Sequence, residues 1–301
     1  MRASSEPSPG PRVISASRRT DIPAFYAEWF KQALDRGEVQ VKNPFGGGWQ
    51  QVSLRPEAVS AIVFWTKDFG PLMGAVEELC RRGYLFYVHF TITGLPRCLE
   101  PRVPCAEAAI RQFRELARRL GPEKMQWRFD PIVISGELTA AETRERFRRL
   151  SAELEGMTRR CYTSFVHLYK KVERNLAAAG IERPDPPRML KEELLGRMAG
   201  IAAERGMKLF VCCDDLLVGG EVRKAKCVDP EILEKIGAKV ARPVRWAPSR
   251  PGCGCMQSTD IGAYDTCPHG CVYCYANSDF VRACRNYVRH RPEEAAILGG
   301  A

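Results

Sequence analysis

The sequence predicts an α/β protein of repeated βα units, a partial or full TIM-type βα barrel, and three observations favour this fold class. Apolar runs of roughly four to ten residues recur along the chain, as buried parallel strands require. Amphipathic stretches with apolar residues at helical spacing follow or separate them. The chain has 301 residues, a length at which barrel folds commonly form one domain.

The elements are expected to alternate in order along the chain. Strands are predicted at 13–17, 61–66, 84–92, 125–134, 162–169 and 207–212. Helices are predicted at 24–37, 70–83, 106–121, 139–156 and 190–206, each ending at a glycine suited to a C-cap. Two alternating runs around three glycines predict a hairpin at 39–54. A further strand at 258–265 and a closing helix at 278–291 complete the pattern.

Composition indicates how the chain divides into domains and in which cellular compartment it is expected. Residues 1–11 are rich in Ser and Pro and predict a disordered lead, and residues 12–301 are expected to form one domain. No apolar run approaches the ~20 residues of a membrane span, and the lead lacks the apolar segment of an export signal. Thirteen cysteines in such a chain favour metal binding or catalysis over disulfides. We therefore expect a cytoplasmic protein with no membrane partner.

The net charge of +10 leaves two interpretations open. A positive field attracts nucleic acid or another anionic ligand. Much of the excess, however, falls in predicted helices at 111–120 and 143–150, where arginine on a solvated face needs no partner.

The stretch CPHGCVYCYAN at 267–277 carries the strongest chemical signal. Cys267, Cys271 and Cys274 are spaced CxxxCxxC on a loop between a predicted strand and a predicted helix. Three thiolates can hold a 4Fe-4S cluster and leave one iron without a protein ligand. A structural zinc site using the trio with His269 or another cysteine is the alternative. The setting in a large α/β chain favours the iron–sulfur interpretation.

This spacing, with Tyr273 directly before the third cysteine, resembles the cluster loop of radical S-adenosylmethionine enzymes. The resemblance implies that the open iron is chelated by the amino and carboxylate groups of the cofactor. An electron from the cluster then splits the sulfonium, and the resulting 5′-deoxyadenosyl radical takes a hydrogen atom from a substrate. A reductant such as ferredoxin or flavodoxin is the implied partner.

The late position of the trio implies a circular permutation. In that superfamily the cluster loop follows the first strand, so here the cluster-bearing first βα unit would stand at the C-terminus. The strand at 258–265 would then pair in parallel with the strand at 13–17, which becomes the second strand.

The segment SRRTDIP, residues 17–23, would follow that second strand. In the superfamily this segment often resembles GGEP and holds the cofactor's amino group. The resemblance assigns that role to Asp21, helped by Ser17 and Thr20. Asp21 also suits the N-cap of the following helix, with Pro23 in the first turn. The two roles are compatible.

The whole chain from residue 12 to about 291 also resembles one bacterial family of unknown function, domain of unknown function 1848. The resemblance rests on VISASRRTDIPAFY, KNPF, FWTKD, FTITG, WRFDPI, SFVHLYKKV and CGCMQSTDIGAYDTCPHGCVYCYAN. Its members are regarded as radical S-adenosylmethionine-like because of these C-terminal cysteines. The family therefore implies the 4Fe-4S cluster and S-adenosylmethionine but no particular reaction.

Polar residues at predicted strand ends are candidates for the active site, because these ends surround it in a βα barrel. Arg128 and Asp130 share a face of one strand, as catalytic groups or as a structural ion pair. Lys67 is expected either to grip a carboxylate or to start a helix, and Tyr169 either to relay hydrogen or to form an aromatic wall. The same edge should gather the remaining polar residues Arg18, Thr91, Thr93, His167 and Lys170.

Four further cysteines crowd the Cys-rich segment 213–257, just before the strand and loop at 258–277. Cys213, Cys227, Cys253 and Cys255 could supply a four-thiolate shell for an auxiliary 4Fe-4S cluster or a zinc ion. Because no CxxC pair is present among them, thiols without metal are the alternative.

The sequence therefore predicts an iron–sulfur, S-adenosylmethionine-dependent radical enzyme. The alternative is a non-catalytic, metal- or cluster-dependent protein that binds nucleic acid.

Overall fold

Eight parallel strands form the central sheet of the protein, in a computed structural model that describes residues 10–299 apart from 45, 137 and 183–184. All seven neighbouring pairs in this sheet run parallel. The predicted α/β class with a large parallel sheet is therefore confirmed. The strands lie in the order β10 (Thr259–Asp260), β1 (Arg12–Ala16), β4 (Val59–Thr66), β5 (Phe86–Thr91), β6 (Met125–Arg128), β7 (Arg160–Thr163), β8 (Lys208–Val211) and β9 (Val222–Lys224).

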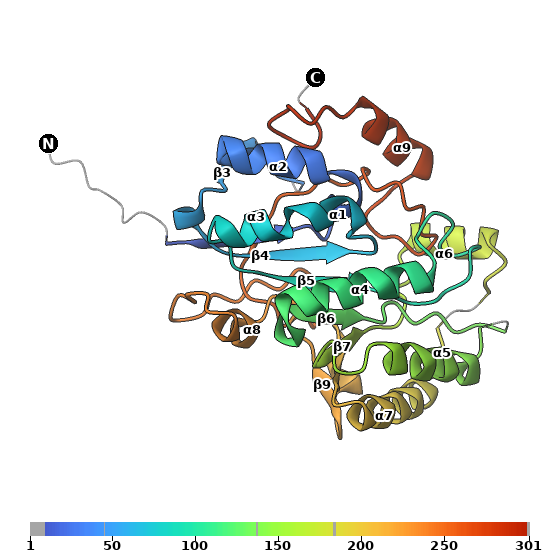
Figure 1. The fold of residues 1–301 in the computed structure, drawn as a ribbon. Coiled ribbons are helices and arrows are strands. Elements are labelled where there is room, and N and C mark those ends of the chain that lie inside the picture. Colours follow the sequence, from blue (N-terminus) through green and yellow to red (C-terminus); the bar gives the residue numbers. More distant parts are fainter. Residues whose placement is uncertain (1–9, 45, 137, 183–184, 300–301) are drawn as a thin grey trace, which may run out of the picture.

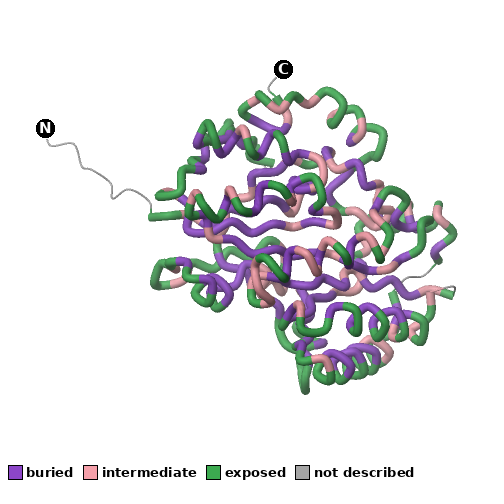
Figure 2. Tube along the Cα trace, in the orientation of Figure 1, coloured by how far each residue is buried: buried purple, intermediate pink, exposed green. Residues whose placement is uncertain are grey.

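Helices cover the sheet, with α3, α4 and α5 on the side that faces the viewer in Figure 1. Figure 2 shows the strands buried and the outer sides of these helices exposed. The predicted hairpin is present as the antiparallel pair β2 (Glu38–Lys42) and β3 (Trp49–Ser53). The helices are α1 (Ile22–Phe25), α2 (Ala27–Arg36), α3 (Val76–Arg81), α4 (Ala106–Leu120), α5 (Ala140–Glu153), α6 (Lys170–Ala178), α7 (Arg188–Glu204), α8 (Pro230–Lys235) and α9 (Phe280–Arg289).

Three elements were not predicted from the sequence, namely β9, α6 and α8. Strand β9 has three residues and α8 has six, which is too short for an apolar period to be read. The strand expected at 162–169 ends at Thr163, and α6 begins soon afterwards. The strand expected at 258–265 is only two residues long.

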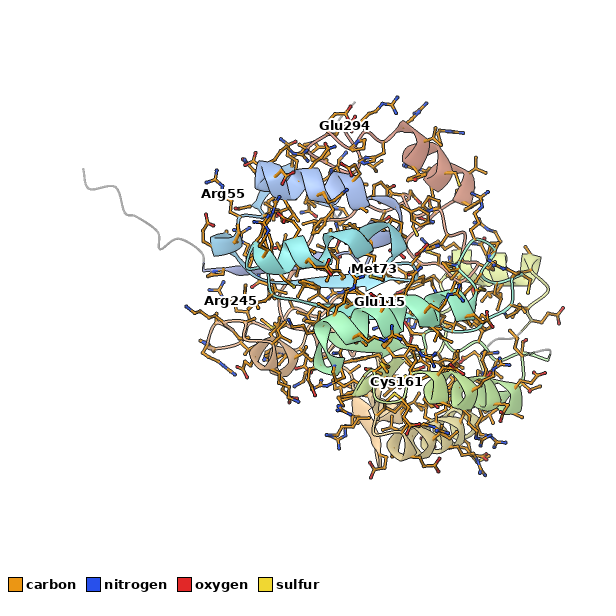
Figure 3. The ribbon with its side chains drawn as sticks, in the orientation of Figure 1. Arg55, Met73, Glu115, Cys161, Arg245 and Glu294 are labelled. Carbon is orange, nitrogen blue, oxygen red and sulfur yellow. The ribbon has the colours of Figure 1, made fainter. Side chains whose placement is uncertain are left out.

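The core between the sheet and the helices is aromatic. Trp127 on β6 stacks on Phe147 of α5, with ring centroids 5.0 Å apart. Phe64 on β4 packs edge-on against Phe86 of β5, with centroids 5.6 Å apart. Cys161 on β7 is fully buried in this core (Figure 3), where it acts as a small apolar side chain.

The sheet is open between its edge strands. In the described part of the chain no ladder joins β9 to β10. The segment 245–257, which precedes β10 in the chain, instead contacts the residues after β9. Met256 N donates to Val228 O, and within the segment Met256 forms a β-bridge with Trp246. A closed barrel is therefore not formed by these described strands.

Strand β10 pairs in parallel with β1, as the sequence analysis expects for these two segments. Thr259 lies opposite Ile14 and Asp260 opposite Ser15. The Asp260 carboxylate accepts hydrogen bonds from Ser15 Oγ at 3.0 Å and Ser17 Oγ at 2.5 Å. It also accepts one from the Arg18 N–H at 2.8 Å. The hydrogen bonds of this carboxylate therefore add to the few backbone hydrogen bonds that a two-residue ladder can form between the strands.

Gly262 permits the same close approach. A Cβ atom at this position would lie 2.1 Å from Ser17 Oγ, which no side chain can tolerate. Glycine is therefore required where the chain leaves β10 beside β1.

The C-terminal segment packs on the N-terminal helices (Figure 1). Trp29 Nε1 of α2 donates to Glu294 O at 3.0 Å, and Tyr26 contacts the ring of Tyr287 on α9. Among the described residues, no helix is long and apolar enough to cross a membrane.

We predict that Asp260→Ala lowers the free energy of unfolding by about 2 to 4 kcal/mol, because several hydrogen bonds to one charged group are lost together. Chemical denaturation measures this change. Asp35→Ala is the matched control, since Asp35 is 60% exposed and its ion pair with Arg82 should contribute less than about 1 kcal/mol. Equal costs for the two variants would contradict the role given to Asp260.

Candidate functional site

The loop that carries the cysteine trio lies at the carboxyl end of β10 and is fastened to the neighbouring loop after β5. Val272 N donates to Leu99 O at 3.0 Å, and Arg102 N donates to His269 O at 3.3 Å. Within the loop, Asn277 Nδ2 donates to Cys267 O at 2.7 Å. These hydrogen bonds hold the loop in place without using the thiols.

Cys271 and Cys274 line a cavity of about 400 Å³. Its other walls come from α6, through Arg174 and Asn175, and from the start of α9 at Phe280. Two of the three thiols are therefore accessible from one cavity.

The three thiols lie in a setting that disfavours free thiolates. Burial raises the pKa of Cys267 well above its usual value, and the nearby groups Asp21, Cys274 and Cys271 raise it further. Burial raises the pKa of Cys271 to about 12, although Lys67 opposes this change. Thiolates at these positions therefore need a compensating cation, which a bound metal supplies.

No three His, Cys, Asp or Glu side chains surround a single point as metal-ion ligands in the part of the chain that the structure describes. A zinc ion needs four ligands on one atom. In a 4Fe-4S cluster each thiolate binds a different iron, so the sulfurs need not converge on one atom.

The Asp21 carboxylate connects the trio loop to the sheet through hydrogen bonds. Its Oδ1 accepts from Ala24 N at 3.1 Å, which confirms the N-cap of α1, and from Thr66 Oγ1 at 2.7 Å. Its Oδ2 accepts from Lys67 N at 2.7 Å and lies 2.8 Å from His269 Nε2. A carboxylate offers about four acceptor positions, and all are used here.

Ser17 and Thr20 are the other two residues assigned to the cofactor, and their side chains differ in hydrogen bonding. Ser17 Oγ donates to Asp260 and accepts from Arg19 N at 2.9 Å. Thr20 is also buried, but its Oγ1 has no hydrogen-bond partner among the described residues. A buried polar atom without a protein partner is unusual, and this hydroxyl is free to bind a ligand.

Lys67 is neither solvated nor simply a helix start. Its Nζ binds Glu100 Oε1 at 2.8 Å, and its side chain is 13% exposed. Glu100 also accepts from Thr93 Oγ1 at 2.9 Å and from the Tyr273 hydroxyl. Burial acts to raise the pKa of Glu100, but Lys67 and these hydrogen bonds together hold it below its usual value. Lys67 therefore pairs with a carboxylate of the protein itself, that of Glu100.

Arg128 and Asp130 form an ion pair, one of the two alternatives that the sequence left open, with Nη2 2.6 Å from Oδ2. Asp130 also accepts from the Ser164 hydroxyl. The second terminal nitrogen of Arg128, Nη1, lies 3.3 Å from Cys227 Sγ. The pair is therefore part of a contact between β6 and the Cys-rich segment.

Comparison with known families agrees with the motifs. A family model described as Domain of unknown function (DUF1848) matches residues 13–276. The chain belongs to this family. No curated protein matches the sequence.

The structure brings most of the predicted site residues of this DUF1848 chain to one edge of the sheet, the carboxyl ends of the strands. Asp21 contacts His269 of the trio loop, and Lys67 is joined to Tyr273 through Glu100. Ser17 and Thr20 lie beside Gly262, where the chain leaves β10. Tyr169 and Lys170 lie at the exposed start of α6, and His167 is exposed beside Tyr169. The edge also holds Cys213, Cys227, Cys253 and Cys255.

Sequence reasoning missed three residues of this DUF1848 site. Glu100 follows β5 by nine residues and has no motif around it. Asp260 was treated as part of a strand, although an acid inside a buried run is itself a signal. Cys212 was assigned to a strand end as an apolar residue, yet its sulfur lies 3.5 Å from Cys227 Sγ.

We predict that Asp21→Ala lowers the free energy of unfolding of this DUF1848 protein by roughly 3 kcal/mol, because it removes a helix cap and the buried contacts with Thr66 and His269. Thr139→Ala is the control, since Thr139 caps α5 in an exposed capping box and should cost about 1 kcal/mol. Thermal and chemical denaturation measure both. A cost no larger than that of Thr139→Ala would show that Asp21 is only a cap.

Proposed function

We propose that the protein is an iron–sulfur, S-adenosylmethionine-dependent radical enzyme, built on a circularly permuted, partial βα barrel. The observation that carries the proposal is the parallel pairing of β10 with β1. It sets the CxxxCxxC loop beside the SRRTDIP turn, which is the arrangement that a permuted cluster-bearing unit requires.

The donor set suits this cofactor pair. Cys267, Cys271 and Cys274 would bind three irons of a 4Fe-4S cluster, and Thr20 would offer its unpartnered hydroxyl to S-adenosylmethionine. The cluster would supply the electron that cleaves the sulfonium of the cofactor. The electron itself would come from a reductase such as ferredoxin or flavodoxin.

Asp21 has a positioning role in this proposal, because its four acceptor positions are taken. It ties His269 of the trio loop to the ends of β1 and β4. A cofactor amino group would have to displace one of these donors in order to reach the carboxylate. The Lys67–Glu100 pair, which binds Tyr273, fixes the loop from the other side.

We predict that replacing Cys267, Cys271 and Cys274 together by Ala removes about four irons per chain after anaerobic reconstitution. The same variant should form no 5′-deoxyadenosine when S-adenosylmethionine and dithionite are added. Iron analysis and chromatography of the nucleoside products measure the two effects. Cys80→Ala and Cys98→Ala are the controls, since both thiols are exposed, and both variants should retain iron and activity.

A wild-type protein that binds iron but never cleaves S-adenosylmethionine would contradict the enzymatic proposal. The remaining interpretation would then be a metal- or cluster-dependent protein that binds nucleic acid, for which the net charge of +10 is the supporting observation. Salt-dependent binding of nucleic acid by the iron-loaded protein would distinguish that outcome.

A further inference from the structure

A second group of five thiols lies at the same edge of the sheet as the trio. Cys212 and Cys213 follow β8, and Cys227 follows β9. Cys253 and Cys255 belong to the segment that runs from the end of β9 toward β10. Three separate stretches of chain therefore bring these sulfurs close together.

The sulfurs form a continuous row. Cys212 Sγ lies 3.5 Å from Cys227 Sγ. Side-chain interactions then join Cys227 to Cys255, and Cys255 to Cys253. Cys253 in turn interacts with Cys213, so the row has Cys212 at one end and Cys213 at the other.

The backbone is shaped to bring this row together. Cys213 has a φ of 57°, in the left-handed region that non-glycine residues rarely adopt. A Cβ atom at Gly252 would lie 3.0 Å from the carbonyl carbon of Cys213, and one at Gly254 would lie 3.0 Å from Ala225 O. The two glycines that flank Cys253 are therefore what allows the GCGC stretch to approach β8 and β9.

Buried positive charge faces the row. The guanidinium carbons of Arg18 and Arg128 lie 5.1 Å and 5.4 Å from the centroid of the Trp65 ring. Arg128 reaches Cys227 Sγ at 3.3 Å, and Arg18 interacts electrostatically with both Cys227 and Cys255. Arg18 Nη2 is buried without a hydrogen-bond partner among the described residues. An unpaired buried donor beside thiols points to an anionic group that the thiols carry when loaded.

The row also has the hydrogen bonds and the access that a bound inorganic centre needs. The Val228 N–H donates to Cys255 Sγ at 3.4 Å, and Ser249 Oγ donates to Cys253 Sγ at 3.5 Å. Such donors tune iron–sulfur centres. A cavity of about 240 Å³, lined in part by Cys213 and Arg250, opens beside the row.

The arrangement of the sulfurs bears on the kind of centre that they could hold. Within the described residues no three candidate ligands surround one point, so the row does not form the shell of a single tetrahedral ion. In a 4Fe-4S cluster each of four thiolates binds a different iron, so the ligands do not have to converge on one atom. Cys212 is buried within an apolar group with Tyr162 and Phe210, whereas Cys213 and Cys227 are only partly buried against that group.

We propose that Cys213, Cys227, Cys253 and Cys255 bind a second 4Fe-4S cluster, whose negative charge Arg18 and Arg128 compensate, while Cys212 contacts Cys227 from the apolar side. This centre is independent of the trio and of the radical chemistry proposed for it. Its loss and the loss of S-adenosylmethionine cleavage are therefore separable.

The experiment starts from the variant in which Cys267, Cys271 and Cys274 are replaced by Ala, reconstituted anaerobically with iron and sulfide. We expect about four irons and four sulfides per chain to remain, with the electron paramagnetic resonance signal of a reduced 4Fe-4S cluster. Adding Cys227→Ser and Cys255→Ser should remove that iron. Adding Cys212→Ala is the matched control, which replaces a thiol of the same row and should retain the iron.

No iron in the starting variant, or iron that survives the Cys227 and Cys255 replacements, would overturn the second cluster. One zinc per chain in place of iron would overturn its assignment as an iron–sulfur centre. Loss of iron on Cys212→Ala would overturn the choice of ligands.

Arg18→Gln on the starting background gives a second measurement that does not depend on removing a ligand. It should retain the iron and make the reduction potential more negative, because a compensating positive charge is lost. An unchanged potential would contradict the pairing of Arg18 with the centre. Circular dichroism of each variant checks that the fold is preserved.

Discussion

The contact between β10 and β1 is the constraint on which the rest of this site depends. A parallel ladder of two residue pairs is weak, and the chain strengthens it with the Asp260 carboxylate, which binds Ser15, Ser17 and the Arg18 backbone. Because the two segments are more than 240 positions apart, no local interaction could align them. Once they are aligned, the trio loop and the turn after β1 share one edge of the sheet.

Two buried carboxylates then fix the trio loop from opposite sides. Asp21 binds His269 while it caps α1, and Glu100 binds Tyr273 while it neutralises Lys67. In both cases several hydrogen bonds to the carboxylate offset the cost of burying its charge. The loop is thus held by groups other than its thiols, so the sulfurs are left to bind something else.

The thiols and the arginines of the second group follow the same physical logic. Burying a thiolate or a guanidinium without a partner costs free energy. Each of these groups therefore stabilises the other at the carboxyl edge of the sheet. Asp130 already pairs with Arg128, whereas Arg18 keeps a buried nitrogen without a partner in the described residues. Arg18 thus carries a local excess of positive charge, which is more informative than the net charge of the whole chain.

The sequence alone determined the elements whose periodicity is strong, such as β4, β5, α4 and α5, and it singled out Cys267, Cys271 and Cys274 by their spacing. It could not reveal β9, α8 or the two-residue length of β10, because such short elements carry no period and exist through tertiary contacts. Long-range packing alone decided that Asp21 would be saturated by partners from three segments, and that Cys212 would touch Cys227. Spacing records which residues are near in the chain, whereas charge compensation and sulfur contact depend on which strands become neighbours.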